Sequence, residues 1–172
     1  MKSSSPLVPA DWIGARRWPG DAGVTGIDMA DAYKLGGVEY RRHPNGGGWV
    51  PDNASVSPSA FVAFAATVGD GASIGEGVAV GNGAKVGDGA TVGNGATVGD
   101  WARVGDWARV GDGAKVGNWA TVGYWAKVGD SATVGDSATV GYQAAVGNKA
   151  TVGEGTTVGN WAKVGDGATV AY

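Results

Sequence analysis

A six-residue repeat dominates this sequence and limits what it can fold into. Residues 50–169 form twenty consecutive hexads with no insertion between them. The first position is Val in all hexads but one, the fifth is Ala in all but two, and the second is Gly in seventeen successive hexads. Because a period of six matches neither the turn of an α-helix nor the triplet of collagen, it predicts short strands joined by tight turns.

Each hexad provides one strand and one turn. Residues two apart on a strand point to the same side, so Ala at position five and Val at position one of the next hexad share a core. Position six lies between them, is mostly polar, and points outward. Pairs such as Asp88-Gly89 at positions three and four are strong turn signals. A single hexad cannot bury its Val, so successive hexads must stack.

Composition removes several other classes of protein. The chain has 34 Gly among 172 residues and Leu only at Leu7 and Leu35, which excludes helical bundles and coiled coils. It has no Cys, which excludes disulfides, thiolate metal sites and cysteine nucleophiles. No apolar run approaches the roughly 20 residues needed to cross a bilayer, and the first residues show no apolar stretch of signal-peptide length. We therefore expect no membrane span.

The hexads resemble the left-handed parallel β-helix of hexapeptide-repeat proteins, whose repeat is aliphatic, Gly-like, two free positions, small, free. The resemblance covers residues 50–170 and implies three hexads per triangular coil, hence about 6.7 coils in a prism roughly 32 Å long. The run RRHPNGGGWV before the first hexad is similar to that of uncharacterised bacterial and phage members. We expect an all-β left-handed parallel β-helix over residues 50–172, preceded by residues 1–49 as an N-terminal cap or attachment segment.

The resemblance also raises the question of catalysis. The best-known relatives are acyltransferases that use a histidine on the helix wall as general base and bind acyl-CoA in a cleft between subunits. This chain has one histidine, His43, which precedes the repeat, and no loop interrupts its hexads. A zinc site of the carbonic anhydrase kind would need three histidines. The sequence therefore predicts no enzyme, no catalytic residue, no metal and no cofactor.

The charged residues are explained by turns and a solvated surface. Regularly spaced acids such as Asp70 and Asp88 suit turn positions better than a calcium site, because calcium-binding β-roll repeats are nine residues long. The hexad region carries seven Lys and Arg against eleven Asp and Glu, with both signs interleaved. Such a surface has no basic stripe, so we expect no nucleic-acid partner.

Aromatic residues break the monotony of the repeat. Trp occupies position four of five hexads, at Trp101, Trp107, Trp119, Trp125 and Trp161, and Tyr124 and Tyr142 stand at position three. Since one coil takes eighteen residues, Trp101 should stack with Trp119, and Trp107 with Trp125. Exposed aromatic patches usually mark contact surfaces. The columns could shield their corners, form the interface of a homotrimer, or stack on a sugar polymer.

Two further features could serve as contact surfaces. Outward-facing threonines form an array resembling ice-binding surfaces, although β-propensity also explains them: Thr97, Thr133, Thr151 and Thr169. The last coil runs into Val170 and Tyr172 without a proline or charged tail. An open end of this kind exposes unpaired backbone, so we expect end-to-end stacking, docking on another component, or shielding within a trimer.

Together these features predict a non-catalytic structural or assembly protein, a rigid rod that forms a homotrimer. A phage virion component (spike, tip or decoration) or a surface component would suit the resemblance, and the cellular location is left open between virion and extracellular surface. The alternative is a polysaccharide-binding module that uses the Trp and Tyr columns. An ice-binding protein and an acyltransferase are less favoured. Docking partners are expected at residues 1–49 or at the open C-terminal coil.

Overall fold

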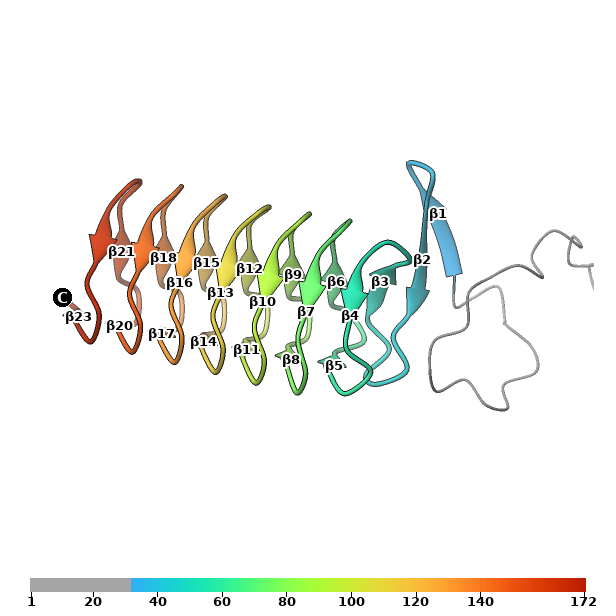
Figure 1. Ribbon diagram of the computed structural model, residues 1–172, viewed down its shortest axis with the longest axis horizontal. Helices are drawn as coiled ribbons and strands as arrows, with labels where there is room; N and C mark the ends of the chain where they lie inside the picture. Colours follow the sequence, from blue (N-terminus) through green and yellow to red (C-terminus); the bar gives the residue numbers. More distant parts are fainter. Residues whose placement is uncertain (1–31) are drawn as a thin grey trace, which may run out of the picture.

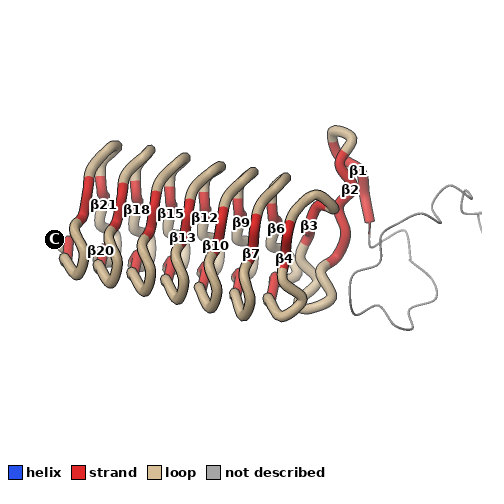
Figure 2. The backbone as a smooth tube through the Cα atoms, in the orientation of Figure 1, coloured by secondary structure: helices blue, strands red, loops and turns tan. Residues whose placement is uncertain are grey.

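The computed structural model describes residues 32–172, and within this range every regular element is a β-strand. The strands form a triangular prism whose coils follow one another along its long axis, with the hairpin β1–β2 at one end (Figure 1). Short strands lie along the three faces, and turns form the three edges (Figure 2). The expectation for residues 1–31 lies outside the described range.

Three parallel sheets form the faces of the prism. The first face contains β3 (Trp49–Pro51), β6 (Thr67–Val68), β9 (Lys85–Val86), β12 (Arg103–Val104), β15 (Thr121–Val122), β18 (Thr139–Val140) and β21 (Thr157–Val158). The second face contains β4 (Ser55–Val56), β7 (Ser73–Ile74), β10 (Thr91–Val92), β13 (Arg109–Val110), β16 (Lys127–Val128), β19 (Ala145–Val146) and β22 (Lys163–Val164). The third face contains β5 (Phe61–Val62), β8 (Ala79–Val80), β11 (Thr97–Val98), β14 (Lys115–Val116), β17 (Thr133–Val134), β20 (Thr151–Val152) and β23 (Thr169–Val170).

Neighbouring strands on a face are eighteen residues apart, so equivalent hexad positions lie side by side. Val92 pairs with Val110, and Val110 pairs with Val128, in parallel register. This arrangement repeats over about seven coils and confirms the predicted left-handed parallel β-helix. We call the edge between the third and first faces corner 1, the edge between the first and second faces corner 2, and the remaining edge corner 3.

The core is a narrow column of Val and Ala, as the hexads predict. Val110 and Ala108 are both buried, and almost every other first and fifth position shares that burial until the last coil. Each buried Val contributes about 1.5–3 kcal/mol relative to leaving it exposed. Small side chains suffice because the three faces converge closely, which explains how a chain so poor in Leu folds.

A second, polar ladder joins the coils at their corners. The carboxylate or amide oxygen at position three accepts a hydrogen bond from the position-three N–H of the preceding coil, as between Asn94 N and Asp112 Oδ1 at 2.7 Å. A Cβ at Gly93 would collide with that same oxygen, so position two must be glycine. The regularly spaced aspartates are therefore backbone acceptors, except Asp70, which accepts the Tyr40 hydroxyl. Residues 32–172 contain no cluster of three or more His, Asp or Glu placed to hold a metal ion.

The hairpin before the first coil covers the N-terminal end of the prism. β1 (Ala32–Leu35) and β2 (Val38–Arg42) pair antiparallel across Gly36-Gly37, and β2 continues the first face by pairing with β3. The Arg42 guanidinium lies 3.9 Å from the ring centre of Trp49 and 4.0 Å from that of Phe64. These contacts fasten the hairpin to the prism. The division into residues 1–49 and 50–172 remains a prediction.

Candidate active-site groove

A groove of about 450 Å³ lies on the first face and reaches corner 2. Its lining runs from Tyr40 and Thr67, near the hairpin, to Tyr124, four coils into the prism. The floor is formed by the last Val of β9, β12 and β15, the Gly that follows each of them, and the turns beyond. No inserted loop is needed, because the face and the raised side chains of its corner form the concave surface.

Two cations stand side by side in the groove. Lys85 and Arg103 are register partners on β9 and β12, both are exposed, and Thr67 and Thr121 flank them on the neighbouring strands. Like charges directly opposite each other on a sheet repel. An anionic group between them would remove that repulsion, so this part of the groove suits a negatively charged ligand.

Two carboxylates line the corner side of the groove. Asp88 Oδ1 accepts the N–H of Asp70 at 2.9 Å, and Asp106 Oδ1 accepts the N–H of Asp88 at 3.1 Å. The ladder thus fixes one oxygen of each carboxylate. Asp106 is half-buried in the lining of the groove, and within residues 32–172 its second oxygen accepts no hydrogen bond.

Tyr40 closes the hairpin end of the groove as a hydrogen-bond donor. Its hydroxyl donates to Asp70 Oδ1 at 2.8 Å. Burial raises the pKa of the Tyr40 hydroxyl well above its usual range, and the hydrogen bond to Asp70 and that residue's negative charge raise it further. Tyr40 therefore stays protonated at neutral pH and cannot act as a base.

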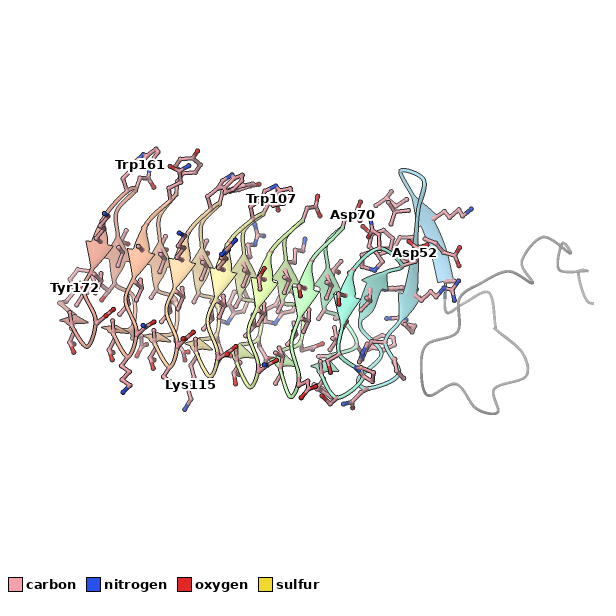
Figure 3. The ribbon with its side chains drawn as sticks, viewed as in Figure 1. Asp52, Asp70, Trp107, Lys115, Trp161 and Tyr172 are labelled. Atoms are coloured by element: carbon pink, nitrogen blue, oxygen red, sulfur yellow. The ribbon has the colours of Figure 1, made fainter. Side chains whose placement is uncertain are left out.

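Tryptophan columns flank the first face on both sides. On corner 1, the rings of Trp101 and Trp119 stack with centres 5.4 Å apart, and on corner 2, those of Trp107 and Trp125 stack at 5.6 Å. The predicted stacking is confirmed, and Trp161 lies farther along corner 2, as Figure 3 shows. All five indoles are exposed, by 51–65%. The role of these columns as oligomer or glycan contacts remains a prediction.

These tryptophans occupy strained backbone positions. Trp101, Trp107, Trp119 and Trp125 have φ between 58° and 61°, the left-handed region that costs a non-glycine residue about 1–2 kcal/mol. Equivalent corners elsewhere carry Gly, as at Gly95. Ser131, Ser137, Gln143 and Lys149 have the same conformation, so the turn at each corner imposes it whatever residue is present.

The tyrosines of corner 2 continue the aromatic surface. Tyr124 lies at the C-terminal end of the groove, and its ring is 55% exposed. Tyr142 makes an edge contact with Trp161, with ring centres 5.5 Å apart, and accepts a hydrogen bond from Gln143. Of the aromatic residues singled out by the sequence, Tyr124 is the one that lines the groove.

The remaining predicted contact residues lie elsewhere. Thr133, Thr151 and Thr169 are in register on the third face, where Lys115 separates them from Thr97. At the last coil, Val170 is half-buried and Tyr172 is 97% exposed. The Thr array and the C-terminal residues therefore do not belong to the groove, and their contact roles stay predictions.

His43 is also outside the groove. It is 2% exposed in the turn between β2 and β3. Its backbone N–H donates to Gly48 O at 2.8 Å, and its ring Nδ1 lies 3.1 Å from Asn45 O. His43 therefore lies before the first coil, as its place before the first hexad indicates. His43 thus supports the turn that enters the first coil.

Sequence reasoning missed the residues that form the groove. In the sequence Lys85 and Arg103 are members of a mixed charged surface, although their coil spacing places them on one face between two Trp columns. Asp106 has the pattern of a turn residue, and its place in the lining depends on the shape of the groove. Tyr40 lies before the repeat and had no signal.

The prism defines the class: a left-handed β-helix built from hexapeptide coils. The sequence profile of bacterial transferase hexapeptide repeats (six repeats) matches residues 65–100 and 89–124. No curated protein matches the sequence significantly. Residues 65–124 thus match the hexapeptide-repeat family, and they lie within the left-handed parallel β-helix that the hexads form.

Solved structures show the same architecture. PerB from Caulobacter crescentus, crystallised with CoA and GDP-perosamine, is 26% identical with a TM-score of 0.51, over 67% of this chain and 47% of PerB. This chain therefore spans about half of PerB. A hexapeptide transferase family protein from Anaplasma phagocytophilum is 21% identical with a TM-score of 0.63, over 67% of this chain and 71% of that one, and shows the fold.

These similarities correct the predicted function. The prediction of a non-catalytic structural protein, virion component included, is wrong, and so is the prediction of no enzyme: the matching profile is that of transferases, and PerB binds CoA. The same finding stands against the alternatives of a polysaccharide-binding module and an ice-binding protein. That prediction rested on the position of His43 and on the uninterrupted hexads, and the first face forms a charged groove without a histidine or an inserted loop in its lining.

Proposed function

We propose that the protein is an acyltransferase that moves an acyl group from CoA to an amine or hydroxyl of a nucleotide-linked sugar. One coincidence carries the proposal: apart from Tyr40, the lining of the groove falls within residues 65–124, the segment that the transferase profile matches. The similarity to PerB, which was crystallised with CoA and GDP-perosamine, supports the two substrate classes.

Asp106 is the proton acceptor in this proposal. The acceptor nitrogen or oxygen attacks the thioester carbon and forms the new bond, the carbon–sulfur bond breaks, and the nucleophile's proton passes to the second oxygen of Asp106. The departing CoA thiolate then takes that proton from Asp106, which restores the carboxylate. Asp106 suits the role because its Oδ1 is held by Asp88 N–H, which fixes the orientation of the carboxylate in the groove.

A homotrimer agrees with the relatives and completes the proposal. The exposed indoles on corners 1 and 2 border the groove, so a neighbouring copy seated on them would cover it and exclude water. In this arrangement the strained tryptophans serve assembly, and assembly encloses the reaction.

The test compares two isosteric variants, Asp106→Asn and Asp112→Asn. Asn occupies the same ladder position at Asn94 and Asn148, where its Oδ1 accepts the same hydrogen bond, so both variants should fold. Free-thiol release from acetyl-CoA would be measured with a panel of amino and hydroxyl sugar nucleotides. We expect Asp106→Asn to lower the rate at least about a hundredfold, and Asp112→Asn, on corner 3, to leave it unchanged.

Two results would contradict the proposal. The first is no thiol release above background with any acceptor in the panel. The second is equal activity of Asp106→Asn and the unmodified protein, which would remove Asp106 from the chemistry.

A further inference from the structure

The polar ladder is interrupted at corner 2, inside the groove. Tyr124 and Tyr142 stand where most corner positions have Asp or Asn, and a tyrosine side chain does not return to the backbone of the preceding coil. As a result, neither the N–H of Asp106 nor that of Tyr124 donates a hydrogen bond within the described part of the chain. The ladder resumes at Tyr142, whose N–H donates to Asn160 Oδ1 at 2.8 Å.

The glycines of the same corner show where a ladder oxygen is missing. A Cβ placed on Gly87 would meet the Asp106 carboxylate first, whereas one on Gly105 would meet only backbone, with Gly123 C and Tyr124 N at 2.8 Å. The side-chain oxygen that would accept the N–H of Asp106 is therefore absent at Tyr124. Two unused donors thus stand one coil apart, about 4.8 Å, along the axis of the prism.

Charge and shape in the same groove indicate what fills this gap. Lys85 and Arg103 line the groove together with Asp106 and Tyr124, so the two cations share one groove with the residues that carry the unused N–H groups. Backbone N–H groups beside cations are the usual cradle of phosphoryl oxygens. The half-exposed Tyr124 ring offers a flat face next to them for a base or a sugar.

We propose that the interruption at Tyr124 forms a subsite for the diphosphate of a nucleoside diphosphate. Phosphoryl oxygens take the place of the missing ladder oxygens on the N–H groups of Asp106 and Tyr124, and Lys85 and Arg103 neutralise the charge. The inference rests on the proposed function, since CoA and a nucleotide-linked sugar both carry a nucleoside diphosphate. In this proposal, the role of Tyr124 is to leave the N–H of Asp106 available to the ligand.

Restoring the ladder provides the decisive variant. In Tyr124→Asn, the new Oδ1 would accept the Asp106 N–H, as Asn118 does for Asp100 N–H at 2.8 Å, and so block the subsite while stabilising the corner. Tyr124→Phe keeps the ring and leaves the donor open. Glu154→Asn is the matched control, because it would close the equivalent gap above Asp136 on corner 1, outside the groove.

Binding of GDP, CoA and guanosine to the full chain would be measured by titration calorimetry. We expect GDP or CoA to bind, guanosine to bind at least about tenfold more weakly, and Tyr124→Asn to weaken the nucleotide about tenfold or more. Tyr124→Phe and Glu154→Asn should stay within about twofold of the unmodified protein. Arg103→Gln should weaken binding and reduce its salt dependence, whereas Arg109→Gln, on the second face, should not.

The two nucleotides distinguish the sources of the diphosphate. Loss of CoA binding alone in Tyr124→Asn assigns the subsite to the acyl donor, loss of GDP binding alone assigns it to the acceptor, and competition between them assigns it to both. The inference is overturned if neither nucleotide binds at millimolar concentration, or if Tyr124→Asn leaves both affinities unchanged. Nucleotide binding that depends on Tyr124 without any acyl transfer would instead remove the proposed function and keep the subsite.

Discussion

The hydroxyl of Tyr40 donates a hydrogen bond to Asp70 Oδ1 at 2.8 Å, across thirty residues of sequence. This contact joins the hairpin to corner 2 of the prism, at the end of the groove. The ring of Tyr33 stacks on the ring of Tyr40 with centres 4.9 Å apart, so Tyr40 is held both by its ring and by its hydroxyl.

This contact predicts a loss of stability at alkaline pH. The folded pKa of Tyr40 lies above the unfolded value of about 10, so the folded state keeps the proton that the unfolded state loses. The contribution is complete below pH 10 and declines as pH rises from there toward the folded pKa. Urea unfolding at pH 9 and pH 11 should show a smaller decline for Tyr40→Phe than for the unmodified protein. Equal declines would show that Tyr40 titrates normally.

The Trp columns predict unequal effects at two glycines with the same backbone. Gly89 and Gly95 have φ of 61° and 64°, but a Cβ on Gly89 would lie 2.6 Å from the Trp107 ring, whereas one on Gly95 would meet open space. Gly95→Ala should cost about 1–2 kcal/mol from backbone strain, and Gly89→Ala about 1–3 kcal/mol more. Chemical denaturation checks both, and Trp107→Ser should abolish the difference between them.

The polar ladder predicts that an amide, but not a methyl group, can replace a carboxylate. Asp130 Oδ1 accepts the N–H of Asp112 at 3.0 Å, on corner 3 and away from the groove. Asp130→Ala should lower the free energy of unfolding by about 1–2 kcal/mol, while Asp130→Asn should change it by less than about 0.5 kcal/mol. Equal losses in both variants would mean that charge, not hydrogen bonding, supports the corner.

The exposed indoles predict assembly. Light scattering on a sizing column, over a range of concentrations, should give a mass near three times 17.0 kDa for the unmodified chain. The double variant Trp107→Ser, Trp125→Ser should be a monomer, because it lacks the rings that would form the interface. It should keep the fold, because serine already occupies the same left-handed position at Ser131 and Ser137. Lys149→Ser, on corner 3, is the control. A monomeric unmodified chain would argue against the Trp columns as an interface.

The hexads make the prism predictable, because each residue's face follows from its position in the repeat. Stacking of Trp101 on Trp119 followed from counting eighteen residues. The hairpin strand Ala32–Leu35 was not predictable, because its pairing with Val38–Arg42 depends on a local turn and on the contact of Val38–Arg42 with the first coil. The groove was missed for a different reason. The position of Lys85 in its hexad is also that of Lys115, and only the surroundings of each face separate them.

The eighteen-residue register also determines how a chain of this kind can change length. Deleting one hexad would rotate every later residue by a third of a turn relative to the coils before it. Loss of residues 104–109 would take Trp119 out of the column of Trp101, and loss of residues 86–91 would place Lys85 and Arg103 on different faces. Removing or duplicating three hexads would instead shorten or lengthen the prism and keep every column in line. Viable insertions and deletions within residues 50–169 are therefore expected in steps of eighteen, and the coil rather than the hexad is the unit of variation.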